Sequence, residues 1–393
     1  MIQRDYLIVG AGIGGATVCE SLREYDPKGT VALVGYESAL PYHRNLLFST
    51  LLAGDDPKAL KKLYCHPPEW YAKNHIELRL ETLVTQINLA RRIAVLSTGQ
   101  VIEFRKCCLA MGSRVRRPQV AGANLGKILY PRNLRDVLAL KEMIAQEKHV
   151  FIIGGDFVAT EAAAALHALG LKVTILCSQP ALWSQWLDPE TARWLTEYFA
   201  EKGVPLLYET LNGFEGKTVL RNIQTKSGNR IAADLAIVAG GVEPNLGLVV
   251  NTPLGSPNGT PVNDCLETDE KGIYAVGDIA LYPDAIFGGV RRSEYPEIAL
   301  AQARIAGANI TGKKRQHFKA LPHHTVTVFN LRFDFVGDFS QTPVRYETEG
   351  EHAKRRFTAR YFQGPKLVGM LLCNQSPEAV EAAKAQVILA HKH

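Results

Sequence analysis

The sequence predicts an α/β protein with two Rossmann-like three-layer domains and a C-terminal α+β domain. Three observations lead to this fold class. A buried strand, a glycine turn and a helix follow one another near residue 6 and again near residue 150. Apolar strand patterns then alternate with helical patterns to about residue 315, which is typical of parallel sheets. From about residue 316, alternating strands are separated by glycine turns and end in a helix with Ser376 as its cap.

The first strand–turn–helix unit is YLIVGAGIGGATVCESLREY. Residues 6–9 are expected to form a strand, and a helix is expected to begin near Ile13. The turn satisfies the fingerprint G-x-G-x-x-G, and Glu37 follows the next strand, where an acid can accept ribose hydroxyls. The glycines of this turn are Gly10, Gly12, Gly14 and Gly15. We therefore predict an intact Rossmann-like dinucleotide site, with the pyrophosphate at the start of the helix.

The second unit, FIIGGDFVATEAAAALHALGLKVTIL, has the same order of elements but an altered turn. Its turn contains Gly154, Gly155, Asp156 and Ala159. Gly154 and Ala159 satisfy the first and third positions of the fingerprint. The second position should be a glycine, so that the backbone can approach a pyrophosphate, and here it is Asp156.

Asp156 weakens the prediction of a nicotinamide site because it places a negative charge where two phosphates should bind. A carboxylate at the start of a helix can itself accept the unpaired N–H groups that a phosphate would use. Cys177, after the next strand, supplies neither an acid for the NAD ribose nor a cation for the NADP phosphate. The alternative is that the turn shifts and NADH still binds adequately.

The segment TDEKGIYAVGDIALYPD predicts a short buried strand that ends at Gly277 and Asp278. It resembles the second flavin motif of the pyridine nucleotide-disulfide oxidoreductase superfamily, where the aspartate holds the ribityl chain of FAD. Further segments resemble this superfamily in the same order along the chain: 40–54, 106–118 with Met111 and Gly112, 234–245 with Gly241, and 293–312. The chain is most similar to the ferredoxin and rubredoxin reductases, the flavin module of nitrite reductase and the apoptosis-inducing-factor group.

The resemblance implies a domain organisation and two cofactors. An FAD-binding domain would comprise residues 1–114 and 240–315, with an NAD(P)-type domain at 115–239 inserted between them. Residues 316–393 would form the α+β interface domain. The implied cofactors are FAD and NAD(P)H, the latter weakened by Asp156 and Cys177.

The segment LPYHRNLLFSTLLAG (40–54) should face the flavin, and it contains no cysteine. Disulfide reductases of the superfamily carry a redox-active pair there, so electrons must pass from flavin directly to an acceptor. Ser49 stands where several relatives have a lysine that pairs with the glutamate matched by Glu161, and Arg44 could be the remaining cation. Burial would raise the pKa of an underpaired Glu161. The alternative is a Glu161 carboxylate that accepts backbone hydrogen bonds.

Two functions follow from this pattern. The first is an FAD enzyme that passes electrons from NAD(P)H to a small redox protein of ferredoxin or rubredoxin type, or to another acceptor. Clusters of cations at 313–319 and 354–356 suggest that a protein acceptor is acidic. The alternative is a flavoprotein with impaired nicotinamide binding that serves as an electron-transfer subunit or a signalling protein of the apoptosis-inducing-factor type.

The composition excludes several other classes. The chain has 393 residues, of which 46% are hydrophobic and 21% charged, and its net charge is +6. These values are those of an ordinary globular protein, without a basic surplus that argues for nucleic acid. We expect no signal peptide or membrane span, no metal site, and a reduced cytoplasmic protein, since seven cysteines form no CxxC. It would be a monomer or a homodimer.

Overall fold

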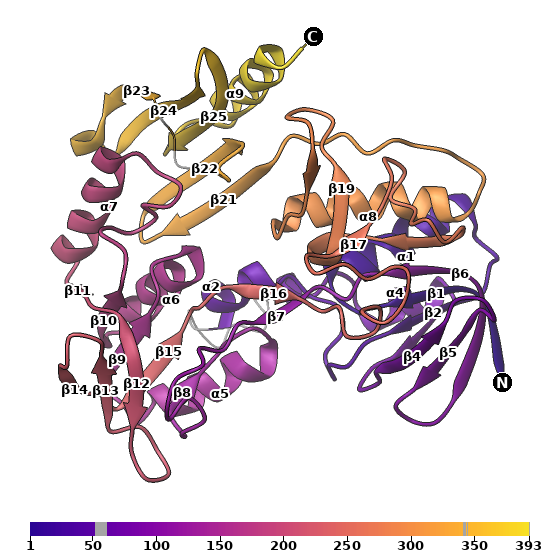
Figure 1. The fold of residues 1–393 in the computed structure, drawn as a ribbon, viewed down its shortest axis with the longest axis horizontal. Helices are drawn as coiled ribbons and strands as arrows, with labels where there is room; N and C mark the ends of the chain where they lie inside the picture. The colour runs from indigo at the N-terminus through magenta and orange to yellow at the C-terminus, as the bar shows by residue number, and fades with distance from the viewer. Residues whose placement is uncertain (52–60, 341–342, 344, 393) are drawn as a thin grey trace. The chain divides into compact units, whose positions relative to one another are not determined.

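The computed structural model of the protein describes residues 1–51, 61–340, 343 and 345–392. The chain divides into two compact units (Figure 1). Unit 1 comprises Met1–His43, Leu60–Arg114 and Glu243–Pro322, and unit 2 comprises Arg44–Ala59, Val115–Val242 and His323–His393. The strands β7 (Ser113–Val115) and β16 (Val242–Pro244), where the chain passes from one unit to the other, pair with each other.

Unit 1 is built on a mixed sheet in the order β3-β2-β1-β6-β5-β4, with β18 also paired to β6. Strands β1, β2, β3, β6 and β18 are parallel, whereas β4 and β5 form an antiparallel hairpin beside β6. The strands of this sheet are β1 (Ile2–Val9), β2 (Val31–Val34), β3 (Ile76–Arg79), β4 (Val84–Asn88), β5 (Ile93–Leu96), β6 (Val101–Leu109) and β18 (Ile273–Ala275). A smaller sheet contains β17 (Thr260–Pro261), β19 (Ala280–Pro283) and β20 (Val290–Arg291).

Alternating residues of β1 fill the cores on the two faces of this sheet, as the period of two predicts. Tyr6 and Ile8 belong to one buried cluster, and Leu7 and Val9 belong to the other. Helix α1 (Ile13–Tyr25) packs closely on α8 (Pro296–Ile310). A β-carbon at Gly307 would lie 2.7 Å from the carbonyl oxygen of Val18, so this contact requires a glycine. Unit 1 also contains the short helix α4 (Pro68–Lys73) and the 3₁₀ turn η2 (Gly277–Ile279).

The central segment of unit 2 forms a parallel sheet in the order β11-β10-β9-β15-β8. Between β11 and β15 the chain forms a separate antiparallel sheet in the order β12-β13-β14. The strands are β8 (Ile128–Leu129), β9 (His149–Ile153), β10 (Lys172–Cys177), β11 (Leu206–Tyr208), β12 (Leu211–Glu215), β13 (Asn222–Thr225), β14 (Arg230–Ala232) and β15 (Leu235–Val238). The central segment contributes the helices α5 (Leu134–Ile144), α6 (Phe157–Ala168) and α7 (Pro189–Glu201), and the earlier segment of unit 2 contains η1 (Arg44–Leu46) and α2 (Leu47–Leu51).

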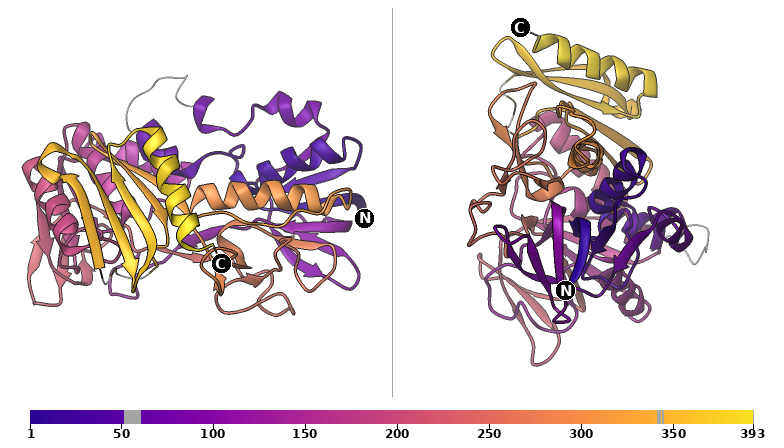
Figure 2. Two further views of the ribbon diagram at one scale, coloured as in Figure 1. Left: turned by 90° about the horizontal axis from the view of Figure 1, so that it is seen from above. Right: turned by 90° about the vertical axis from the view of Figure 1, so that its right-hand side faces the viewer.

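The C-terminal part of unit 2 is an antiparallel sheet in the order β21-β22-β25-β24-β23. It contains β21 (His323–Val328), β22 (Leu331–Gly337), β23 (Arg345–Glu351), β24 (Arg356–Gln363) and β25 (Lys366–Cys373), with η3 (His352–Lys354) between β23 and β24. Helix α9 (Pro377–Ala390) lies against β22 and β25 (Figure 2), and its cap is Ser376, as predicted. The polar strand β23 was not predicted.

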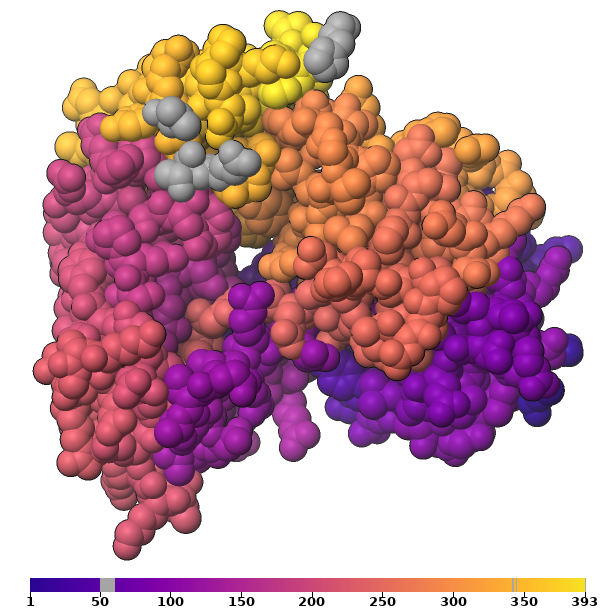
Figure 3. Space-filling view, in the orientation of Figure 1, coloured from indigo at the N-terminus to yellow at the C-terminus, as the bar shows by residue number. Residues whose placement is uncertain are grey.

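The C-terminal part of the chain packs on α7, and Figure 3 shows the two segments in contact. The ring of Trp194 on α7 contacts that of Phe357 on β24, and the Thr191 hydroxyl lies 3.0 Å from His352 Nε2. The hydroxyl of Tyr361 donates to the buried carboxylate of Asp188 at the start of α7, over 2.8 Å. Among the helices of the described residues, none has both the length and the apolar character needed to span a bilayer.

Candidate functional site

The first glycine turn, in unit 1, is open to a ligand at the start of α1. Gly10 has φ +115°, and a β-carbon there would lie 2.1 Å from the carbonyl oxygen of Ala110. A β-carbon at Gly15 would lie 1.9 Å from the carbonyl oxygen of Gly10. Gly12 caps α1 without any side-chain hydrogen bond, and a β-carbon there would meet no atom within 4 Å. The first N–H groups of α1 therefore face a space that a pyrophosphate can enter.

The remaining residues predicted to contact FAD lie at the same edge of the sheet, because β1, β2, β6 and β18 are parallel and end there. Glu37 follows β2, and its Oε2 accepts a hydrogen bond of 2.6 Å from the hydroxyl of Tyr42. Met111 and Gly112 follow β6. Their carbonyl oxygens accept hydrogen bonds from Asn245, over 2.8 Å from its side chain and 2.9 Å from its backbone N–H.

Gly277 and Asp278 follow β18 and are held from three sides. The Gly277 N–H donates to Oε1 of Gln302 over 2.7 Å, and Arg292 Nη1 donates to the carbonyl oxygen of Asp278 over 3.1 Å. The Ser113 hydroxyl donates to the Asp278 carboxylate. Sequence reasoning did not single out Ser113, Gln302 or Arg292, although Ser113 directly follows the predicted Gly112.

These residues fit an FAD molecule. The uncapped helix start provides the pyrophosphate site, Glu37 provides a ribose acceptor, and Asp278 provides a carboxylate for the ribityl chain. The amide nitrogen Nε2 of Gln302 is buried and has no hydrogen-bond partner in the described part of the chain. A buried donor without a partner is costly, and a ligand atom would satisfy it.

The second glycine turn, in unit 2, has the same backbone as the first but is filled by a side chain. Gly154 has φ +136°, and a β-carbon there would lie 2.3 Å from the carbonyl oxygen of Ala239. Asp156 caps α6 with φ −88° and ψ −174°, close to the φ −95° and ψ −169° of Gly12. Its Oδ1 accepts a hydrogen bond of 2.9 Å from the N–H of Ala159. The predicted cap is thus confirmed, and the turn has the same local conformation as the first.

The loop after β10 closes onto this turn. Cys177 is buried, and a β-carbon at Gly155 would lie 2.5 Å from its sulfur. The N–H of Trp183 donates to the carbonyl oxygen of Gly155 over 3.2 Å. Cys177 therefore packs against the turn and, as predicted, offers no charge to a ribose or a ribose phosphate.

Glu161 lies on α6, one turn after Asp156, and combines both of the predicted alternatives. Burial, and to a smaller extent the negative charge of Asp156, raise the pKa of Glu161 to about 8. A backbone hydrogen bond from Thr327 opposes this shift in the pKa. The carboxyl group is therefore protonated at neutral pH although one backbone donor faces it.

Three other predicted residues also lie in unit 2. Arg44 Nη1 donates to the carbonyl oxygen of Arg132 over 3.1 Å. Ser49, on α2, is exposed, and its hydroxyl donates to the carbonyl oxygen of Leu46 over 3.3 Å. Gly241 has φ +77°, and its carbonyl oxygen accepts a hydrogen bond of 2.9 Å from Arg116. Residues 52–54 of the predicted flavin-facing segment lie outside the described residues.

All seven cysteines are free, and six of them are buried. Burial raises the pKa of Cys19, Cys65 and Cys373 to about 12. It also raises the pKa of the adjacent Cys107 and Cys108, which lie inside β6 between β1 and β18. Since the thiolate is the reactive form, these five cysteines are poor redox groups at neutral pH.

Two glycine turns, each between a buried parallel strand and a helix, define a protein with two dinucleotide-binding folds. Residues 4–307 match the family described as pyridine nucleotide-disulphide oxidoreductase. The chain belongs to this family and is an oxidoreductase. Family members of the NAD(P)H-dependent reductase type bind FAD and use NAD(P)H. The predicted family and fold class are therefore confirmed, as are FAD and NAD(P)H as the cofactors of such reductases. The weakening of NAD(P)H binding by Asp156 and Cys177 stays a prediction.

Individual proteins resemble the chain over most of its length. A rubredoxin-NAD(+) reductase of Pseudomonas putida is 30% identical over 78% of this chain and 80% of its own. A monodehydroascorbate reductase of Pisum sativum is 27% identical over 96% of this chain and 92% of its own. The crystal structure of a covalent putidaredoxin reductase–putidaredoxin complex contains a chain that matches with a TM-score of 0.91 and 26% identity. That match covers 100% of this chain and 97% of the other.

Proposed function

We propose that this protein passes electrons from NAD(P)H, through bound FAD, to a small iron–sulfur protein. When bound, FAD supplies the ability to accept a hydride and to release electrons singly. Gly10, Gly12 and Gly15 would hold its pyrophosphate, Glu37 its ribose and Asp278 its ribityl chain. The observation that carries the proposal is the uncapped start of α1 together with these polar groups at one edge of the sheet.

The route out of the flavin would use no thiol. Residues 40–54 contain no cysteine, and the free cysteines with a raised pKa are poor nucleophiles at neutral pH. Free thiols also fit a reducing compartment, so we place the protein in the cytoplasm. Fractionation of cells that produce the protein tests the compartment.

The acceptor would be acidic and would dock by charge. The exposed cations Lys313, Lys314, Arg315 and Lys319 follow α8 in unit 1, and we call them the 313–319 patch. Carboxylates lie near two of these cations: Lys313 Nζ is 3.7 Å from Asp26 Oδ1, and Asp264 and Glu267 interact electrostatically with Arg315. In unit 2, Lys354, Arg355 and Arg356 form a second group, in which Lys354 pairs with Glu351. Such patches raise association rates, and salt screens them over about 10 Å at 0.1 M.

An anaerobic turnover assay tests the function. The FAD-loaded protein is mixed with NADH or NADPH and with oxidised rubredoxin, a [2Fe–2S] ferredoxin or the monodehydroascorbate radical. We expect one of the iron–sulfur proteins to be reduced fastest, at a rate that falls with salt and in Lys314→Gln/Lys319→Gln. Lys217→Gln, an exposed control in unit 2, should not change that rate. Preference for the organic radical, or a rate independent of salt, would contradict the proposed acceptor.

One observation favours a second function. The carboxylate of Asp156 accepts an N–H group at the start of α6 that a pyrophosphate would otherwise use. If this excludes nicotinamide, the protein would be a flavoprotein that receives electrons within a complex, or that signals like the apoptosis-inducing-factor group. Failure of both NADH and NADPH to reduce the flavin, while dithionite reduces it, would support this alternative.

A further inference from the structure

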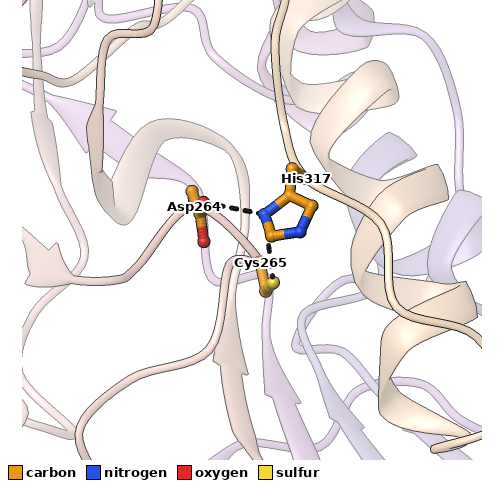
Figure 4. Close-up of side chains that lie close together, drawn as sticks. All are labelled: Asp264, Cys265 and His317. Atoms are coloured by element: carbon orange, nitrogen blue, oxygen red, sulfur yellow. Dashed lines mark hydrogen bonds and ion pairs between the residues drawn. The ribbon is translucent and has the colours of Figure 1, made fainter.

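Three side chains with metal-ligating atoms, none of them proposed to bind FAD, meet on unit 1 (Figure 4). They are Asp264, Cys265 and His317, which we call the Asp–Cys–His cluster. Nδ1 of His317 lies 2.7 Å from Oδ2 of Asp264 and 3.8 Å from the sulfur of Cys265. All three candidate ligand atoms lie within 4.8 Å of one another. One imidazole nitrogen therefore faces both a carboxylate and a thiol.

The backbone holds the two segments of this cluster together without any metal. Asn309, a buried residue of α8, donates from Nδ2 to the carbonyl oxygens of Cys265 (2.9 Å) and Gln316 (2.8 Å). Its Oδ1 accepts the N–H of Gln316 over 2.7 Å. The N–H of Phe318 donates to the carbonyl oxygen of Asp264 over 2.6 Å. Both ligand-bearing segments are thus fixed by groups outside the cluster.

The loop that carries Asp264 and Cys265 is also ordered by its own turn. Oδ1 of Asn263 accepts the N–H groups of Cys265 (2.8 Å) and Glu267 (3.1 Å). This arrangement directs the Cys265 side chain into the structure, where it is buried, whereas Asp264 and His317 remain about half exposed. A bound ion would thus contact a sulfur atom of fixed position and two partly exposed side chains that can change their conformation.

We infer that the Asp–Cys–His cluster binds one Zn²⁺ ion, with water as the fourth ligand. Zinc prefers tetrahedral sites of sulfur, nitrogen and oxygen at about 2.3, 2.0 and 2.1 Å, which places sulfur and nitrogen roughly 3.6 Å apart. The observed separation between sulfur and Nδ1 is 3.8 Å. The carboxylate would move away from Nδ1 by about 0.6 Å to reach the tetrahedral separation of about 3.3 Å. Its exposure permits this movement.

The charges of the cluster match a divalent cation when the ligands are deprotonated. The thiolate of Cys265 and the carboxylate of Asp264 would together neutralise Zn²⁺, and the neutral imidazole adds no charge. Arg315 lies within hydrogen-bonding reach of the Cys265 side chain and is a competing cation. It is exposed, so its guanidinium can move into solvent when the metal takes its place.

Titration of the FAD-loaded, chelator-treated protein with ZnCl₂ at pH 7.5 tests this inference. We expect one Zn²⁺ per chain and removal of Cys265 from reaction with a thiol reagent. Cys265→Ser, His317→Gln and Asp264→Asn should each weaken binding about tenfold or more, since even outer contacts of a metal contribute 10- to 100-fold. Asp269→Asn removes an exposed carboxylate of the same segment outside the cluster and should leave the affinity unchanged.

Each result decides the inference independently of electron transfer, because binding is measured by metal content and thiol protection. Retained FAD absorbance shows that a variant is folded, and Asp264→Asn keeps the shape of the side chain if Cys265→Ser does not fold. Zinc bound in substoichiometric amounts would overturn the inference. The inference is also overturned if the cluster variants bind zinc like the wild type, which would leave Asp264 and His317 as a hydrogen-bonded pair only.

Discussion

Replacement of Asp156 should strengthen nicotinamide binding. The backbone angles of Asp156 and Gly12 differ by about 7° in φ and 5° in ψ (−88° against −95°, and −174° against −169°). The two turns thus differ at this position in the side chain and hardly in the backbone. A phosphate at the start of α6 would accept the same N–H of Ala159 that now donates to Asp156 over 2.9 Å. Asp156→Gly would give the second turn the open helix start of the first.

The magnitude follows from the charge. Two unit charges 4 Å apart repel by roughly 1 kcal/mol in water and about 4 kcal/mol at an effective dielectric constant of 20. Removal of the carboxylate should therefore lower the dissociation constant of NADH or NADPH by roughly fivefold to several-hundredfold. Glycine in place of an aspartate cap costs only a few tenths of a kcal/mol, and its backbone entropy costs up to about 1 kcal/mol. We expect tighter binding together with a slightly lower melting temperature.

Asp156→Asn separates charge from capping, since asparagine caps a helix about as well as aspartate. It should gain most of the affinity and lose little stability. Dissociation constants can be measured by titration of the oxidised flavoprotein with a non-reducing nicotinamide analogue, and stability by thermal unfolding. A wild-type protein that binds the analogue at low micromolar concentration, with neither variant binding better, would refute the reasoning.

Three further results are expected. Glu161→Gln should abolish a loss of wild-type stability between pH 4.5 and 8. The reason is that Glu161 keeps its proton up to a pKa of about 8 in the folded state but loses it near 4.5 in the unfolded chain, so the free energy of unfolding falls by at most about 5 kcal/mol over this range. Urea unfolding of the wild type and the variant measures this change. A difference in unfolding free energy between them that is the same at every pH would refute it. Gly12→Asp should keep unit 1 folded, because a β-carbon there meets no atom within 4 Å, but should lower FAD affinity by roughly the same factor as above. A variant whose FAD dissociation constant equals that of the wild type would contradict the assignment of the first turn. Replacement of each cysteine by alanine should leave the rate of flavin reduction nearly unchanged in every variant that retains FAD; one such variant that cannot turn over would show that a thiol carries electrons.

Local patterns predicted the elements that carry the two turns. Helix α1 begins at Ile13 as expected, because the glycine turn and the apolar period after it are encoded in adjacent residues. The strand that ends before Gly277 was predicted for the same reason. The cap of α6 by Asp156 could be predicted as well, since capping depends on a side chain and an N–H group three residues apart.

Features that depend on distant residues could not be read from the sequence. Strand β23 is missed because an edge strand needs no apolar face, and its sequence RYETEGE is almost entirely polar and exposed. Ser113 reaches Asp278 across 165 residues, and Cys265 meets His317 across 52. These contacts depend on the order of the strands in the sheet and on the loop after α8, and no periodic pattern of residues in the sequence indicates them.

Anaerobic double-mixing stopped flow tests the central account most directly. The oxidised FAD protein is first mixed with one equivalent of NADH or NADPH, and then with excess oxidised iron–sulfur carrier. We predict that flavin absorbance is lost in the first step and returns in the second, with two carrier molecules reduced per flavin. The same stoichiometry should hold when exposed thiols are blocked beforehand. A flavin that the nicotinamide never reduces, or one that returns its electrons only when thiols are free, would contradict the account.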